Sequence, residues 1–216
     1  VWVPFITLVV TGFLTILFIG PFARTLGELL TGFFGFLFKT PGLKYLGALL
    51  FGSLYAPLVI TGLHHTFIAV DLQLAASTGG TFIWPMIAIS NIAQAGAVLA
   101  TYFLYKSDKK QESVSMSGFV SAAFGITEPA MFGANMKYMY PFYAALIGSA
   151  VGALICTHFT VLANGIGVGG VALAWLSIKP SSMVMFMIAT VLTFGIAFGL
   201  TFVFSKTKLN KGSLTD

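Results

Sequence analysis

The feature that most constrains this chain is a set of long apolar runs without Asp, Glu, Lys or Arg. These runs cover residues 2–19, 45–62, 82–105, 141–162 and 183–204. An α-helix needs about 20 such residues to cross a bilayer, and a crossing segment must satisfy its own backbone hydrogen bonds. Only 8% of the 216 residues are charged, against roughly 25% in a soluble domain. The sequence therefore predicts an all-α membrane protein.

Local signals refine the first two runs. We expect residues 2–19 to form one crossing helix that Gly20-Pro21 closes. The next stretch, 22–38, carries Arg24 and Glu28 four residues apart and therefore on one helical face, which predicts an interfacial or partly buried amphipathic helix. Pro57 should kink or end the helix of residues 45–62.

The basic residues indicate an orientation. The net charge of +5 falls in short polar segments rather than in a basic cluster with interleaved aromatics, so no nucleic-acid partner is expected. Residues 106–112 contain three lysines, and Lys206, Lys208 and Lys211 lie in the tail, so both segments are predicted to be cytoplasmic. Two spans separate them. Both ends share one side only if the intervening segment enters and leaves the membrane on one side, as a re-entrant hairpin.

One carboxylate, Glu128, lies in an apolar segment, residues 124–133, that Gly and Pro interrupt. A charge at bilayer depth is costly, so the default interpretation is a substrate or ion site that faces a polar cavity. Pro129 should bias Glu128 away from helical geometry, while Gly125 and Gly133 permit tight turns. A helix-capping or ion-paired glutamate in a loop is the alternative.

A second polar group lies between Lys44 and Lys106 in the sequence. It consists of the adjacent His64 and His65 and of Asp71, the one charged residue in that interval. Neighbouring helical residues point about 100° apart, so one of the two histidines is expected to face the site. Farther along, Ser90, Asn91 and Gln94 recur at about one helical turn. They could hydrogen-bond between helices or line a cavity.

Other chemistry finds little support. The Gly-rich stretch 164–170 has no preceding strand and no following Lys-Ser or Lys-Thr pair, so it indicates a flexible connection or close helix packing rather than a phosphate loop. His64, His65 and Asp71 are too few and too irregularly spaced to predict a metal, and no cofactor is expected. Cys156, the one cysteine, is expected to be a buried, inert thiol.

These motifs resemble the membrane C domain (EIIC) of the enzyme II sugar permeases of the bacterial phosphotransferase system (PTS). Residues 125–133, Gly-Ile-Thr-Glu-Pro-Ala-Met-Phe-Gly, resemble the GITEP signature of the glucose superfamily of these permeases. Four further segments resemble the trehalose-specific branch, with the sucrose branch next: residues 62–65, 69–73, 84–94 and 164–170.

The resemblance implies transmembrane helices and re-entrant hairpins around a central sugar site. Residues 1–62 would supply spanning and amphipathic helices, and residues 63–216 the sugar-binding transport domain of a partial EIIC domain. It also implies a multi-pass protein of the bacterial cytoplasmic membrane, a homodimer when complete. The chain begins in apolar sequence without Met or a basic n-region, so we expect no signal peptide and a start within a longer protein.

The implied activity is group translocation of trehalose or a related disaccharide. A phosphocysteine of a cytoplasmic EIIB domain, supplied by EIIA and HPr, would phosphorylate the sugar 6-hydroxyl. This chain alone is expected to be inactive because it lacks that domain. An ion-coupled secondary transporter and a membrane sensor or structural subunit are the alternatives. Dependence on a phosphoryl donor would distinguish a group-translocating permease from the transporter, and turnover would distinguish it from the sensor or structural subunit.

In relatives, the Glu of GITEP and a His of the GxHH motif hydrogen-bond the sugar, and here Glu128 and His64 or His65 match them. Glu128 would position a sugar hydroxyl, and the histidine would act as general base or hydrogen-bond partner. Asp71 and Gln73 could bind sugar or pin the local structure. The candidate sugar-binding residues are His64, His65, Asp71, Gln73, Asn91, Thr127 and Glu128, of which His64, His65 and Glu128 are the catalytic candidates.

Overall fold

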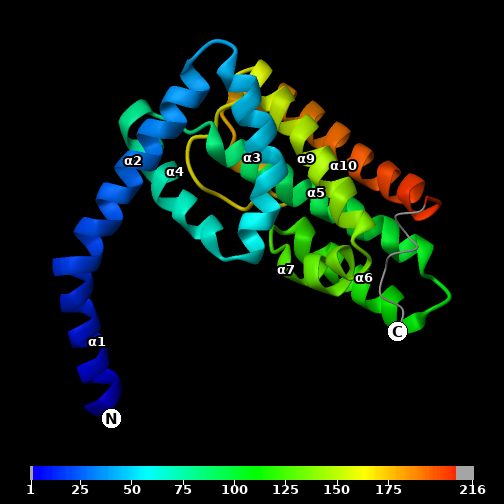
Figure 1. Cartoon of the computed structure of the whole chain (residues 1–216), viewed down its shortest axis with the longest axis horizontal. Coiled ribbons are helices and arrows are strands. Elements are labelled where there is room, and N and C mark those ends of the chain that lie inside the picture. The colour runs from blue at the N-terminus through cyan, green and yellow to red at the C-terminus, as the bar shows by residue number, and fades with distance from the viewer. Residues whose placement is uncertain (1, 208–216) are drawn as a thin grey trace.

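The computed structural model of the chain describes residues 2–207, except for some side chains between residues 23 and 39. The described residues form helices joined by turns and by one longer loop, residues 159–182 (Figure 1). The only extended pairings among them are isolated bridges, Thr81 with Ala163 and Ala163 with Ile178. The prediction of an all-α protein is confirmed.

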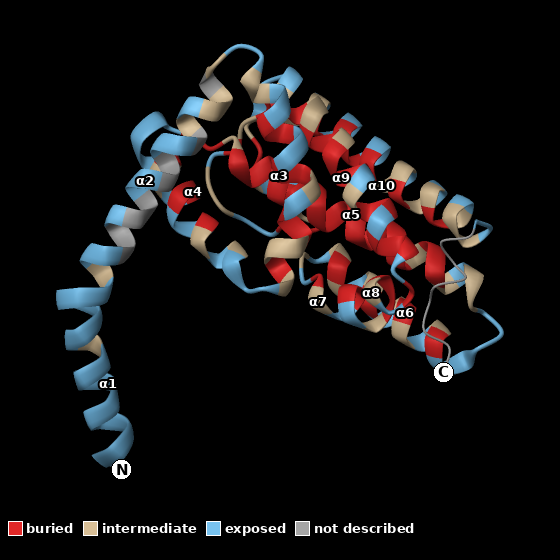
Figure 2. Cartoon of the chain, in the orientation of Figure 1, coloured by how far each residue is buried: buried red, intermediate tan, exposed pale blue. Residues whose placement is uncertain are grey.

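The chain begins with one long helix that leaves the rest of the molecule. It comprises α1 (Trp2–Leu14), a π-helical turn η1 (Thr15–Ile19) and α2 (Gly20–Lys39). The large apolar side chains of α1 are exposed, and α1 projects away from the other helices (Figures 1 and 2).

Gly20-Pro21 does not end the helix, although the apolar span itself stops close by, at Phe22. The N–H of Gly20 bonds to the carbonyl of Thr15 across the π turn. Pro21 then lies in the first turn of α2, where its missing N–H costs little. The helix therefore continues to Lys39, where the amphipathic helix was predicted to end.

Four helices pack side by side as the core: α3 (Leu43–Ile60), α5 (Ile83–Leu104), α9 (Tyr140–His158) and α10 (Met183–Ser205). They and the run Trp2–Phe22 are the described helices long and apolar enough to cross a membrane. Every residue of α5 from Ile83 to Val98 is buried (Figure 2). The predicted spans are thus confirmed to within a few residues, and Pro57 lies in the last turn of α3.

The core helices define two ends of the molecule. One end, here called the lysine end after Lys106, Lys109 and Lys110, holds the end of α5, the end of α10 and the start of α9. There the Tyr140 hydroxyl donates to the Tyr105 hydroxyl at 3.1 Å. Phe103 on α5 lies beside Phe198 on α10, with ring centroids 6.1 Å apart. The far end holds the starts of α3, α5 and α10, and there the Tyr45 hydroxyl is 3.0 Å from His158 Nδ1 at the end of α9.

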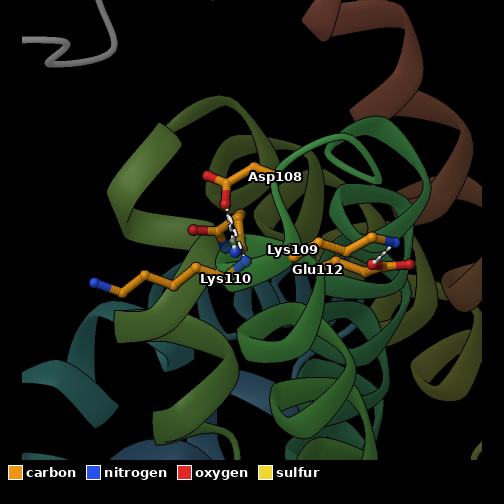
Figure 3. Close-up of polar contacts among 5 residues, drawn as sticks. Asp108, Lys109, Lys110 and Glu112 are labelled. Atoms are coloured by element: carbon orange, nitrogen blue, oxygen red, sulfur yellow. Dashed lines mark hydrogen bonds and ion pairs between the residues drawn. The ribbon is translucent and has the colours of Figure 1, made fainter.

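The predicted polar loop 106–112 is shorter than expected. Asp108 caps α6 (Lys109–Ala123) by accepting hydrogen bonds from the N–H groups of Lys110 and Gln111 at 3.0 and 3.1 Å (Figure 3). Lys109 forms an ion pair with Glu112 at 2.8 Å within the first turn (Figure 3). Residues 109–112 are therefore helical, and Gln111 is buried.

The segment between α5 and α9 is a helical hairpin. Its first arm is α6, and its second consists of α7 (Glu128–Ala130), the π turn η3 (Met131–Asn135) and α8 (Met136–Tyr138). Lys137 Nζ donates to Gln111 Oε1 at 2.8 Å, so the two arms start and finish together at the lysine end. This geometry is what the predicted re-entrant hairpin requires.

Two further segments return to the far end. After α3, the turn containing η2 (Leu63–His65) leads into α4 (Thr66–Thr78), which runs back beside α2. After α9, residues 159–182 form a loop with the short helices η4 (Ala174–Ser177) and η5 (Pro180–Ser182). The Lys179 N–H donates to the Leu162 carbonyl at 2.9 Å, so this loop also closes on itself.

Candidate functional site

Glu128 is the first residue of α7, directly after a tight turn. Gly125 has a φ of 94°, in the left-handed region, and its N–H donates to the Ala122 carbonyl at 2.9 Å. The Ser121 hydroxyl donates to the Ile126 carbonyl at 2.9 Å, which closes the turn.

Two details of the prediction for this segment are wrong. Glu128 has helical geometry, because Pro129 lies in the first turn of α7, where a proline is tolerated. Gly133 lies inside η3 rather than in a turn. The irregular backbone therefore precedes Glu128, at residues 125–127.

The loop from the far end meets this turn. The Ala172 N–H donates to the Ala123 carbonyl at 3.0 Å, and the backbone of Gly170 packs directly against Ala123 and Gly125. Asn91, on α5, lies between the two segments: its Nδ2 is 3.5 Å from the Gly125 carbonyl, and Gly169 packs on its amide. Segments that enter from opposite ends thus meet beside α5, an arrangement typical of transporter sites.

The turn between α3 and α4 carries the two histidines. His64 is half-buried, with its ring centroid 6.3 Å from that of Tyr55, whereas His65 is exposed. Burial and the neighbouring His65 lower the pKa of His64, although the charge of Glu128 acts on it in the opposite sense. His64 is thus neutral and close enough to Glu128 for its charge to act on it, so it is better placed than His65 to contact a ligand that binds at Glu128.

The Glu128 carboxylate forms no hydrogen bond or ion pair with any side chain in the described part of the chain. Its position in the first turn of a helix favours a negative charge. Thr127 is buried and makes no side-chain capping bond. Both residues therefore have polar groups available for a ligand, and the ion-paired interpretation gains no support.

Asp71 has a structural partner. It is fully buried and accepts a hydrogen bond from the Thr81 hydroxyl, which in turn accepts one from the Ile83 N–H at 3.1 Å. These bonds tie α4 to the first residue of α5, and so favour the pinning role over sugar contact. Gln73 is half-buried on the same helix, two residues farther on.

The amide stripe on α5 makes contacts between helices. Gln94 Oε1 accepts a hydrogen bond from Asn135 Nδ2 at 2.7 Å, which attaches η3 to α5. Nearer the lysine end, Thr101 bonds to Ser115 at 3.0 Å, and Ser115 accepts from Gln111 at 3.1 Å. Polar contacts therefore hold the Glu128 hairpin along α5, while Asn91 alone of the stripe reaches the meeting point.

Sequence reasoning missed three residues near this site. The Tyr55 ring packs edge-on against His64, with ring centroids 6.3 Å apart. Trp84 Nε1 donates to the Ser177 hydroxyl at 2.9 Å, which holds the far-end loop against α5. An aromatic residue in an apolar run is usually interpreted as part of the core, so only the neighbouring polar motifs could have indicated Tyr55 and Trp84.

The described residues thus form a multi-pass helical membrane protein, in which Glu128 has no side-chain partner among them and lies beside the contact of two segments that enter from opposite ends. Residues 2–149 match the family "Phosphotransferase system, EIIC", and the chain belongs to that family. No solved structure matches it significantly.

Relatives of two sugar specificities are about equally similar. The chain is 45% identical over 171 residues to the sucrose-specific EIIBC component of Staphylococcus xylosus, covering 78% of this chain and 35% of that protein. It is 42% identical over 212 residues to the trehalose-specific EIIBC component of Escherichia coli (strain K12), covering 98% of this chain and 44% of the relative. The chain thus spans less than half the length of these relatives, and trehalose is not singled out over sucrose.

Proposed function

We propose that this chain is the sugar-binding part of a PTS permease that takes up trehalose or sucrose and presents it for phosphorylation. Family membership and the names of the trehalose- and sucrose-specific relatives support this function. The observation that carries it is the Glu128 carboxylate, which has no side-chain partner among the residues the structure describes and lies beside the contact of two opposed segments.

The residues around Glu128 suit a sugar. A hydroxyl donates to the Glu128 carboxylate, and the neutral His64 ring either accepts the proton of a hydroxyl or donates to its oxygen. The Thr127 hydroxyl and the Asn91 amide supply further polar groups close to the Gly125 turn. In this proposal, the residues that do not contact the sugar directly are His65, Asp71 and Gln73.

Phosphorylation then needs positioning more than covalent chemistry from this chain. The sugar 6-oxygen attacks the phosphorus of a phosphocysteine on the EIIB domain, the S–P bond breaks, and the hydroxyl proton leaves to His64 or to water. Glu128 has the wrong charge to stabilise an incoming phosphoryl group, so its role is to orient the acceptor hydroxyl.

The proposal includes the organisation of the complete protein. Residues 1–62 serve as spanning and amphipathic helices and residues 63–216 as the transport domain of a homodimer in the bacterial cytoplasmic membrane. Its partners are EIIB and, upstream, EIIA and HPr, and the lysine end faces the cytoplasm, where EIIB docks.

Replacement of Glu128 by glutamine in the complete permease tests the function. A lost hydrogen bond to a charged group is worth about 1.5–3 kcal/mol, so sugar binding or phosphorylation should fall by roughly one to two orders of magnitude. Glu112→Gln, which alters only the exposed ion pair with Lys109, is the matched control and should change neither. Full activity of the Glu128→Gln variant would refute the assignment, and sugar uptake that needs no phosphoryl donor would favour ion coupling.

A further inference from the structure

A separate cavity of about 280 Å³ lies at the far end, away from Glu128. Its walls come from α2, α4, α9 and the residues that flank α5, and they include the apolar side chains of Phe38, Leu74, Phe82 and Cys156. The rings of Phe38 and Phe82, with centroids 4.8 Å apart, pack together on one side.

The lining excludes a sugar as the occupant. A sugar needs several hydrogen-bonding partners, whereas this surface is predominantly apolar and its hydroxyls, from Thr78, Thr157 and Thr160, are few. An engineered apolar cavity of roughly 150 Å³ in another protein stays dry and binds benzene. A cavity nearly twice that size, on a membrane protein, suits a length of hydrocarbon chain.

Two lysines lie where a headgroup would be. Lys44 lines the cavity, and the Nζ of Lys179 lies against Gly80, another part of the cavity wall. In the described part of the chain neither lysine forms an ion pair with a carboxylate, and Lys44 Nζ lies 5.0 Å from the centroid of the Tyr45 ring. Lys44 follows the first residue of α3, and Lys179 precedes the span that begins at Pro180, so both lie at the depth of lipid headgroups.

We propose that this cavity binds an anionic phospholipid, with part of one acyl chain between α4 and α9 and its phosphate between Lys44 and Lys179. Charge and apolar lining together define the occupant: a zwitterionic lipid brings its own cation beside its phosphate and so leaves the charge of the two ammonium groups uncompensated, and a free anion leaves the apolar walls empty. The site is independent of the sugar site and does not rest on the proposed transport function.

Lipid binding to the delipidated protein in detergent, counted by native mass spectrometry, tests the proposal. Dioleoyl-phosphatidylglycerol should bind with several-fold higher affinity than dioleoyl-phosphatidylcholine. Lys44→Gln and Lys179→Gln should each weaken phosphatidylglycerol binding about fivefold and leave phosphatidylcholine unchanged. Lys106→Gln, at the lysine end, is the charge-matched control and should have no effect. Equal affinity for the two lipids, or no effect of either far-end variant, would overturn the proposal.

Thr78→Cys in a Cys156→Ala background supplies a readout of where the lipid binds, because Thr78 lines the cavity and is exposed, whereas Cys156 is buried. An apolar maleimide should label the introduced thiol, located by peptide mass spectrometry, and saturating phosphatidylglycerol should slow the labelling at least tenfold. Because Lys44→Gln keeps the cavity intact, that variant should be labelled at the normal rate but need about fivefold more lipid for protection. Labelling that phosphatidylglycerol leaves unchanged would place the bound lipid elsewhere and refute the site.

Discussion

Replacement of Gly170 by alanine should separate the two segments that meet beside α5. A Cβ at this position would lie 2.5 Å from the carbonyl carbon of Ala123, and nearer still to its oxygen and to the N–H of Gly125. Ordinary carbon–carbon contacts are about 3.5–4.0 Å. The loop or the hairpin turn must therefore move by about 1 Å, because both neighbours are backbone atoms that cannot rotate away.

The size of the effect follows from that displacement. Overpacking costs about 1–3 kcal/mol, and the Ala172 to Ala123 hydrogen bond, 3.0 Å long, adds about 0.5–1.5 kcal/mol if it breaks. At about 2–4 °C per kcal/mol, the midpoint of thermal unfolding should fall by at least about 3 °C. Displacement of Glu128, three residues after Gly125, by about 1 Å should lower sugar phosphorylation by roughly 10²-fold.

The same loop offers a matched control. An alanine Cβ at Gly165 would meet no atom within 4 Å, and Gly165 does not have a positive φ. Gly165→Ala should therefore change stability by less than about 0.5 kcal/mol and leave phosphorylation intact. Thermal unfolding in detergent and phosphorylation by the complete donor cascade would compare the two variants. Identical behaviour of Gly170→Ala and Gly165→Ala would refute the contact between the segments.

Two shorter predictions concern the frame around the site. Thr81→Val should destabilise the protein by about 1–3 kcal/mol, because the buried Asp71 carboxylate loses its side-chain donor. Thr81→Ser keeps the hydroxyl and should not destabilise, so equal thermal midpoints of the two variants would contradict the pinning role. In a Cys156→Ala background, Ser107→Cys at the lysine end should react with an impermeant maleimide only from the cytoplasm, and the far-end Ser181→Cys only from outside. The reverse pattern would invert the proposed orientation.

The spanning helices could be predicted because their signal is local and additive. A run of about 20 residues without charge leaves the chain few alternatives in a bilayer, so the ends of α5 and α10 fall within a residue of the prediction. Gly20-Pro21 shows the limit of local rules. A π turn before Pro21 accommodates its missing N–H, and nothing in residues 15–19 distinguishes such a turn from an ordinary helix.

The site was only partly predictable, for a related reason. Glu128 stands out because a charge in apolar sequence is costly, and that reasoning needs no partner to be known. The same reasoning selected Asp71, whose partner Thr81, ten residues away, makes it structural. The contact of Gly170 with Ala123 joins distant parts of the chain through backbone atoms, so no pattern of side chains in the sequence could indicate it.

The contact between Gln94 and Asn135 distinguishes a structural amide pair from one that serves the sugar. Gln94 Oε1 accepts from Asn135 Nδ2, but Gln94 Nε2 and Asn135 Oδ1 are buried without a hydrogen bond in the described structure. Asn135→Leu leaves the Gln94 amide buried and unpaired, and Gln94→Leu leaves the Asn135 amide with only its 3.1 Å hydrogen bond to the backbone carbonyl of residue 94, each at a cost of about 1–3 kcal/mol.

The double variant, Gln94→Leu with Asn135→Leu, removes both polar groups, so a purely structural pair predicts stability close to that of the parent and well above the sum of the single losses. Thermal midpoints of the four proteins give the coupling. Phosphorylation assays then separate the two roles, because Gln94 lies one turn from Asn91 on α5. If Gln94 Nε2 and Asn135 Oδ1 face the sugar, the double variant should recover stability while sugar binding stays weak. Recovery of both stability and sugar binding would mean that the amide pair only attaches the hairpin to α5. Additive losses of stability would contradict the pairing itself.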